Sequence, residues 1–325
     1  MHRRRKENCY GSTSGFTLVE MAIVIPIFGL LLAGAIVLGR PLLEEHRAAI
    51  TQQNMQHIIN VTSVYAQRNN RIPCPADSNA NDVAQPTGAE VGSGPAGTAL
   101  PVVSAVGGCV NAGVSFNEGI VPYRTLGMSV SDVRDGNGNY ITYHVNANFA
   151  RDPNTVLTVH AYCRASTWFD AAGTTNINPM RAQFCCANNA IPGQTITVKD
   201  TNSVSLFPYT QDANANDYQA AGKPYPGSGG ETGSLSPATT DETTIAFVLV
   251  SHGAIGGGAF LDVGGRAPAN ADTGTSEATN SSGGATFVWA QKNASYGANH
   301  FDDILMWRTQ DQVYAETGTG TCALP

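Results

Sequence analysis

The longest hydrophobic segment lies near the start of the chain, where Phe16 to Gly39 reads FTLVEMAIVIPIFGLLLAGAIVLG. Glu20 is the single charged residue in this segment of 24. A helix rises about 1.5 Å per residue, so this segment is long enough to cross the roughly 30 Å hydrocarbon core of a bilayer. The pattern therefore predicts a transmembrane helix over residues 16–39.

The helical pattern continues beyond this segment but becomes amphipathic over residues 40–70. Asn69-Asn70 and Pro73 predict the end of the helix, so we expect one helix of about 50 residues over 17–68. Prolines at positions 26 and 41 favour kinks, although a lipid-exposed helix also tolerates proline. The apolar residues expected on one face of the amphipathic half are Leu43, Ile50, Ile58, Val61 and Tyr65.

The rest of the chain, residues 71–325, alternates between strand-like runs and biased stretches. Stretches rich in Gly, Ala, Asn, Ser and Pro predict loops up to Gly108 and at roughly 210–242 and 264–284. Asp135-Gly136-Asn137-Gly138-Asn139 is a strong hairpin-turn signal. We predict an α+β fold in which the long helix packs on an antiparallel, β-rich and loop-rich globular head. The strand-like runs are Ile120–Tyr123, Tyr140–Val145, Thr155–Tyr162, Gln194–Val198, Val204–Phe207, Thr243–Ser251 and Ala285–Ala290.

Composition and charge narrow the class of protein. Only 13% of residues are charged, and 35 of 325 are glycine, which is typical of a secreted, loop-rich domain and not of a cytosolic enzyme. The net charge is −7, but residues 1–15 carry four basic residues and one acidic residue. The remainder is therefore acidic, at −10, and lacks the Lys and Arg cluster that nucleic-acid binding requires.

The cysteines also indicate export. Cys9 lies in the first 15 residues, and its removal would leave an even set of six, as an oxidising compartment favours. We expect disulfides, with pairing left open because six cysteines can pair in many ways; buried free thiols are the alternative. Adjacent cysteines rarely bond to each other, and no zinc-site spacing is present. The disulfide candidates are Cys74, Cys109, Cys163, Cys185, Cys186 and Cys322.

Residues 1–15 form an arginine-rich leader that directly precedes the hydrophobic segment. An ordinary secretory signal has a shorter apolar region followed by small residues, whereas here the polar leader ends in Gly15 and the apolar run follows at once. The positive-inside rule keeps the leader cytoplasmic and places the body across the membrane. A carboxylate such as Glu20 inside a membrane helix costs several kcal/mol unless it is paired, and so indicates a functional residue.

The run Gly15-Phe16-Thr17-Leu18-Val19-Glu20 resembles the cleavage and methylation motif of type IV prepilins and pseudopilins. The resemblance implies that a prepilin peptidase cuts between Gly15 and Phe16 and methylates the new amine of Phe16. It also implies that Glu20 becomes the fifth mature residue and contacts the amine of a neighbouring subunit during assembly. A plain signal anchor is the alternative.

Later phrases resemble a subset of bacterial prepilin-type proteins with large, cysteine-containing heads. The family implies localisation in the bacterial inner membrane as a single-pass protein, with the N-terminus cytoplasmic, the head periplasmic, and a cell-surface filament as a further destination. The phrases are RIPCPAD (71–77), GIVPYRTLGM (119–128), DGNGNYITYHV (135–145), FVLVSHG (247–253) and FDDILMWRT (301–309).

No catalytic constellation is recognisable, and we expect no enzyme activity and no cofactor. Ser251-His252-Gly253 lacks the first glycine of a hydrolase elbow, and neighbouring strand residues point to opposite faces. Asp302 and Asp303 are weak candidates for a structural calcium site, because some pseudopilins bind calcium through C-terminal acidic loops; a capping role is the alternative. The histidines are scattered and indicate no ligand cluster.

Taken together, the sequence predicts a structural subunit, a minor pilin or pseudopilin of a type IV pilus or type II secretion-type filament. The expected partners are prepilin peptidase, other pilin or pseudopilin subunits and the inner membrane, and nucleic acid is not expected. The alternative is a tip adhesin or substrate-binding module displayed on such a filament.

Overall fold

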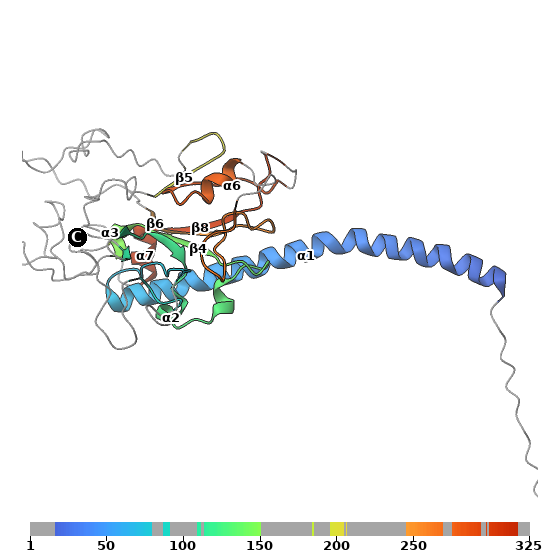
Figure 1. Cartoon of the computed structure of the whole chain (residues 1–325), viewed down its shortest axis with the longest axis horizontal. Helices are drawn as coiled ribbons and strands as arrows, with labels where there is room; N and C mark the ends of the chain where they lie inside the picture. The colour runs from blue at the N-terminus through green and yellow to red at the C-terminus, as the bar shows by residue number, and fades with distance from the viewer. Residues whose placement is uncertain are drawn as a thin grey trace, which may run out of the picture. The chain divides into compact units, whose positions relative to one another are not determined.

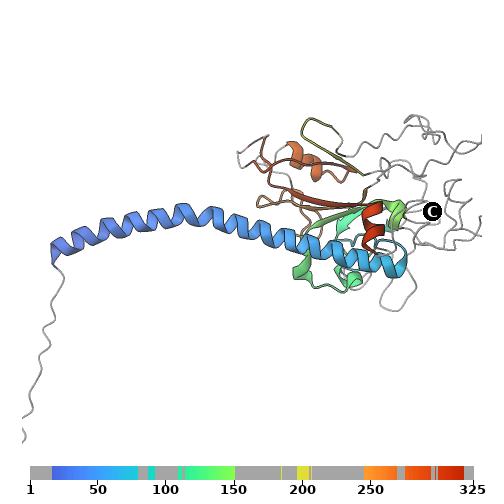
Figure 2. The ribbon, with the colours of Figure 1, turned by 180° about the vertical axis from the view of Figure 1, so that it is seen from behind.

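The structure is a computed structural model, and its helices, strands and sheet are shown in Figures 1 and 2. The chain divides into two compact units, Met1–Arg47 and Ala48–Pro325. The structure describes residues 17–79, 87–91, 109–111, 114–150, 184, 196–204, 206, 245–268, 275–293, 297 and 299–317, with side chains at 31–41, 111, 114, 115 and 311 left out.

A single helix, α1, occupies Leu18–Asn69 and continues through both prolines without interruption. It ends where Asn70 adopts a left-handed backbone conformation (φ 56°) and donates its N–H to the carbonyl of Ala66 at 2.8 Å. This geometry satisfies one of the terminal carbonyls of the helix. The helix predicted over 17–68 is thus confirmed in length.

The face that α1 buries differs from the predicted stripe. Leu43 is exposed, and Val61 and Tyr65 are only half-buried, whereas Ile58 is fully buried as expected. Polar and small side chains occupy part of the buried face and let the helix approach the sheet closely. That face consists of Thr51, Met55, Ile58, Ile59, Thr62, Ser63 and Ala66.

None of the helices formed by the described residues combines the length with the hydropathy that a membrane crossing requires. Phe16 and the side chains of 31–41 belong to the predicted span of 16–39 and lie outside the described residues.

The centre of the Ala48–Pro325 unit is a four-stranded antiparallel sheet in the order β3-β4-β6-β8. Two further strand pairs are formed by β1 with β2, antiparallel, and by β5 with β7, parallel. The strands are β1 (Val110–Asn111), β2 (Val114–Ser115), β3 (Glu118–Ile120), β4 (Thr142–Val145), β5 (Thr197–Lys199), β6 (Ile245–Ser251), β7 (Thr286–Val288) and β8 (Ile304–Thr309). The short helices are α2 (Tyr123–Leu126), η1 (Val130–Val133), α3 (Ala147–Ala150), α6 (Thr275–Asn280) and α7 (Gln310–Glu316).

The sheet is covered on both faces, so β6 is buried along its whole length. Phe247 and Leu249 pack in a core with the C-terminal part of α1, whereas Val248 and Val250 pack in a second core with Phe287 of β7. Successive strand residues point to opposite faces, and each such buried side chain stabilises the fold by about 1.5–3 kcal/mol. Figures 1 and 2 show the C-terminal part of α1, from Ala48 on, on one side of the sheet and the β5–α6 region on the other. The α+β fold with an antiparallel sheet is therefore confirmed.

Several predicted elements need correction. The strand predicted at Ile120–Tyr123 ends at Ile120, because Pro122 is the N-cap of α2, which begins at Tyr123. The loop predicted at 264–284 contains α6, and β8 was not predicted. Val204 and Leu206 are not in a strand, and the run Thr155–Tyr162 lies outside the described residues.

The predicted turn at residues 135–139 is confirmed. The Asp135 N–H donates to the Asn139 carbonyl at 2.8 Å, and Asp135 Oδ1 accepts the N–H groups of Asn137 and Asn139, both at 2.9 Å. Asp135 Oδ2 accepts the Ser251 hydroxyl at 2.8 Å. Oδ1 thus satisfies local backbone donors of the turn, and Oδ2 ties the turn to Ser251 at the end of β6.

A buried ion pair joins the end of α1 to the segments that follow it. Arg71 Nη1 and Nη2 each donate to an oxygen of Glu90 at 2.9 Å. Glu90 also accepts the Tyr65 hydroxyl and the Cys74 N–H, both at 3.0 Å, and burial together with the charge of Glu90 raises the pKa of Tyr65. Cys74 forms a disulfide with Cys109. The phrase RIPCPAD is therefore a structural junction; Cys9, Cys163, Cys185, Cys186 and Cys322 lie outside the described residues.

Candidate functional site

Two regions carry candidate functional residues: the start of α1 and a polar layer in the head. At the start of α1, Glu20 Oε2 accepts both the N–H and the hydroxyl of Thr17 at 2.8 Å. Thr17 Oγ1 in turn accepts the Glu20 N–H at 3.2 Å. These reciprocal bonds form a capping box, so the Glu20 carboxylate has a partner within its own helix. Gly15 and Phe16 lie outside the described residues.

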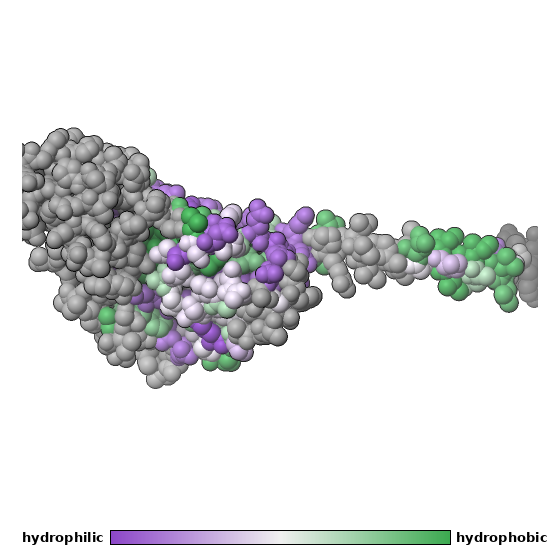
Figure 3. Space-filling view, turned by 90° about the horizontal axis from the view of Figure 1, so that it is seen from above, coloured by the Kyte–Doolittle hydropathy of each residue, from purple (hydrophilic) through white to green (hydrophobic). Residues whose placement is uncertain are grey.

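The first turns of α1 present apolar side chains on every side of the helix. All of the described side chains from 17 to 30 are exposed, and Leu18 reaches 87%. Figure 3 shows this stretch as a green, hydrophobic surface. A helix that is apolar all round is normally buried in protein or lipid. The exposed large apolar residues are Leu18, Val19, Met21, Ile23, Val24, Ile25, Ile27, Phe28 and Leu30.

The second region, which we call the polar layer, lies near the second core on the face of the sheet away from α1. It is unusual because carboxylates and histidines are buried together there. Burying charged groups is costly unless they are paired or shift their pKa. Its members are Glu118, Thr142, His144, His252, Arg266, Glu277, Asn280, His300, Asp302 and Asp303.

Glu118 on β3 is the charged centre of one part of the polar layer. Arg266 Nη2 lies 2.5 Å from Glu118 Oε1, and His144 Nδ1 lies 3.8 Å from Oε2. Burial alone would raise the pKa of Glu118, but the interaction with His144 and the charge of Arg266 outweigh it and lower the pKa. His144 also meets Phe287 edge-on at 5.3 Å between ring centroids. Glu118 and Arg266 therefore form an ion pair in this part of the layer.

His252 follows β6 and is completely buried. Its Nε2 lies 3.0 Å from Thr142 Oγ1, and its Nδ1 lies 3.8 Å from Asp303 Oδ1. Burial and the charge of Arg266 lower the pKa of His252 to about 4, so the ring is neutral. Ser251, by contrast, bonds to Asp135. Ser251 and His252 therefore have different partners.

Acid should destabilise the head through His252. The unfolded histidine takes up a proton below about pH 6.5, whereas the folded one stays neutral to about pH 4, so the free energy of unfolding falls across this window. At about pH 4, the free energy of unfolding should be lower by about 3 kcal/mol than at neutral pH. His252→Gln should flatten this slope in urea unfolding, and His57→Gln, at an exposed position, should not. An unchanged slope in His252→Gln would contradict the assignment.

Asp303 and Asp302 belong to different parts of the polar layer. Asn280 Nδ2 donates to Asp303 Oδ2 at 2.8 Å, and Asn280 also bonds to both backbone groups of Val288. Burial raises the pKa of Asp303 well above its usual range, although the bond from Asn280 opposes this. Asp303 therefore links α6 to the chain just before β8, and Asp302 and Asp303 have different partners.

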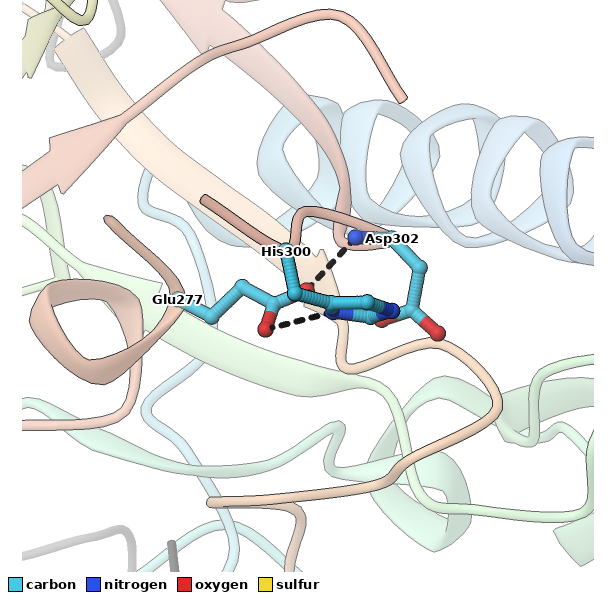
Figure 4. Close-up of side chains that lie close together, drawn as sticks. All are labelled: Glu277, His300 and Asp302. Atoms are coloured by element: carbon cyan, nitrogen blue, oxygen red, sulfur yellow. Dashed lines mark hydrogen bonds and ion pairs between the residues drawn. The ribbon is translucent and has the colours of Figure 1, made fainter. Parts of the chain in front are cut away.

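Asp302 instead lies beside Glu277 and His300 (Figure 4). His300 Nδ1 is 3.0 Å from both carboxylate oxygens of Glu277, and the Asp302 N–H donates to Glu277 Oε1 at 2.5 Å. One ligand atom from each of the three residues lies within 4.8 Å of the others. His300 therefore lies in a group of three side chains that could hold a metal ion, which the scattered histidines of the sequence did not indicate.

Sequence reasoning missed Glu277 and His300 because no motif spacing links them. They are 23 residues apart, and α6 has no apolar periodicity that would predict its helix or its buried face. The one usable signal was Asp302 itself, in the phrase FDDILMWRT.

Comparisons of the chain with protein-family models, with curated proteins and with solved structures found no significant match.

Proposed function

We propose that this chain is a structural subunit, a minor pilin or pseudopilin, of a type IV pilus or type II secretion-type filament. A prepilin peptidase removes residues 1–15 and methylates Phe16. The apolar start of α1 then holds the subunit in the inner membrane, with the head in the periplasm, until it joins other subunits.

The proposal rests on the length of α1 and on the contrast between its exposed apolar start and its buried C-terminal part. One helix of 52 residues begins with an apolar stretch exposed on every side and continues into a segment that is buried in the core of the head. Apolar side chains exposed to water do not stabilise an isolated chain. A large exposed apolar surface instead indicates a site of contact with lipid or with another protein. The preceding run from Gly15 to Glu20, with its resemblance to a prepilin motif, supports processing at this end.

Processing can be tested at Gly15. Replacing Gly15 with Leu should block cleavage, because the peptidase must accommodate the residue before the cut, and the membrane form should keep its leader. Gly11→Leu is the matched control in the same leader, and it should be processed normally. N-terminal sequencing of the membrane form provides the measurement. A mature wild-type protein that begins at a residue other than Phe16 would refute the proposed cut.

A further inference from the structure

We propose that Glu277, His300 and Asp302 bind one divalent transition-metal ion of the Zn²⁺ class, at a site separate from the assembly segment. Glu277 comes from α6, and His300 and Asp302 come from the chain just before β8. In Figure 4 the His300 ring lies between the two carboxylate side chains. A metal ion bound there would link α6 to the central sheet.

The spacing of the ligand atoms fits such an ion. Around a tetrahedral Zn²⁺ with bonds of 2.0–2.2 Å, ligand atoms lie about 3.4 Å apart. His300 Nδ1 lies 3.0 Å from each oxygen of Glu277, and the whole set falls within 4.8 Å. Small side-chain movements are therefore sufficient to place all three ligands on one ion.

A buried oxygen of Asp302 independently supports the proposed site. Among the described residues, Asp302 Oδ1 is buried without a hydrogen-bond partner. The contact between His300 and Glu277 is satisfied as a simple ion pair, but that ion pair leaves Asp302 Oδ1 unexplained. A buried carboxylate oxygen without a donor is costly, and a metal ion bound by all three residues removes this cost.

The surrounding backbone holds the two carboxylates in position. The Ala254 N–H donates to Asp302 Oδ2 at 2.8 Å, and the Asp302 N–H donates to Glu277. Gly253 has φ 58°, and a Cβ at this position would lie 2.1 Å from Asp302 Oδ1. The glycine of the phrase FVLVSHG thus leaves the space that the Asp302 carboxylate occupies. Hydrogen bonds that orient ligands in this way are typical of metal sites.

The histidine indicates which metal the site would prefer. Calcium takes six to eight oxygen ligands, whereas imidazole suits Zn²⁺ and related ions and carboxylates complete the set. Asp303, the other residue considered for calcium, is bonded to Asn280. We therefore infer zinc-type and not calcium-type binding at this site.

Zinc titration of the full chain in detergent, after treatment with a chelator, tests the proposal. Calorimetry should show one Zn²⁺ per chain, and Zn²⁺ should raise the Tm. His300→Gln should weaken binding by about 100-fold or more, because even residues that only orient ligands are worth 10–100-fold. His57→Gln, at an exposed histidine, should bind as the wild type does. Equal binding by His300→Gln, absence of Zn²⁺ binding, or a preference for Ca²⁺ would overturn the proposal.

X-ray absorption of the zinc-loaded wild-type chain gives an answer even if His300→Gln fails to fold. The spectrum should contain the scattering of a single imidazole together with oxygen ligands. A spectrum with oxygen ligands alone, or with sulfur, would contradict the assignment to Glu277, His300 and Asp302.

Discussion

Glu20→Val should abolish, or reduce about 100-fold, the recovery of the chain in sheared filaments while leaving cleavage and membrane insertion intact. In the proposed filament, the Glu20 carboxylate lies in an apolar interface and pairs with the methylated amine of Phe16 on a neighbouring subunit. Removing one partner of a buried pair costs about 3–5 kcal/mol, which is more than about a hundredfold in an equilibrium constant. Insertion should not suffer, because the substitution removes a charge from lipid.

Two matched variants separate the charge of Glu20 from its role in the capping box. Glu20→Gln keeps the reciprocal hydrogen bonds with Thr17 but removes the charge, so it should fail to assemble as Glu20→Val does. Thr17→Ala removes the capping hydroxyl and keeps the charge, so it should assemble. If Glu20→Gln assembles and Glu20→Val does not, the residue starts the helix and does not contact a subunit. Normal assembly of Glu20→Val would indicate a membrane-anchored periplasmic domain.

Arg71→Met should lower the free energy of unfolding of the head by about 3–5 kcal/mol, the typical cost of removing one partner of a buried ion pair. Both side chains are buried, and Glu90 would lose the guanidinium of Arg71 while keeping its bonds from Tyr65 and Cys74. The result would be a buried carboxylate without the Arg71 charge at the junction between α1 and the head. Urea unfolding of the full chain in detergent, followed by tryptophan fluorescence, measures the loss.

The double variant Arg71→Met/Glu90→Leu tests the cause of that loss. If an unpaired charge destabilises the single variant, removing both partners should restore part of the stability. Asp262→Asn, which removes an exposed ion pair with Arg134, should cost less than about 1 kcal/mol. A loss in Arg71→Met no larger than that in Asp262→Asn would show that the junction does not depend on the ion pair.

The elements that could be predicted were those with a strong local signal. The unbroken apolar run and the amphipathic spacing after it predicted α1 to within a residue or two. Asp135 and its glycines predicted a turn, because the Asp side chain satisfies nearby backbone N–H groups. The β-branched run at Thr243–Ser251 predicted β6 (Ile245–Ser251), since a strand covered on both faces is continuously apolar.

The elements that could not be predicted depend on contacts with residues that are far away in the sequence. β8 reads ILMWRT, whose mixed burial gives no clean alternation, and it forms because it pairs with β6. α6 reads TSEATN and is held by the bonds of Asn280 to Val288 and Asp303. The cluster of Glu277, His300 and Asp302 exists only where those two elements meet. The spacing of these residues along the sequence therefore could not predict that their side chains lie together.

The central claim, that the chain is processed after Gly15 and assembled into a filament, is tested most directly on filaments themselves. Filaments sheared from cells that produce the wild-type chain should be digested and analysed by mass spectrometry. The account predicts an N-terminal peptide that begins at Phe16 and carries one added methyl group. A chain that is absent from the sheared fraction and remains in the membrane with residues 1–15 attached would contradict it.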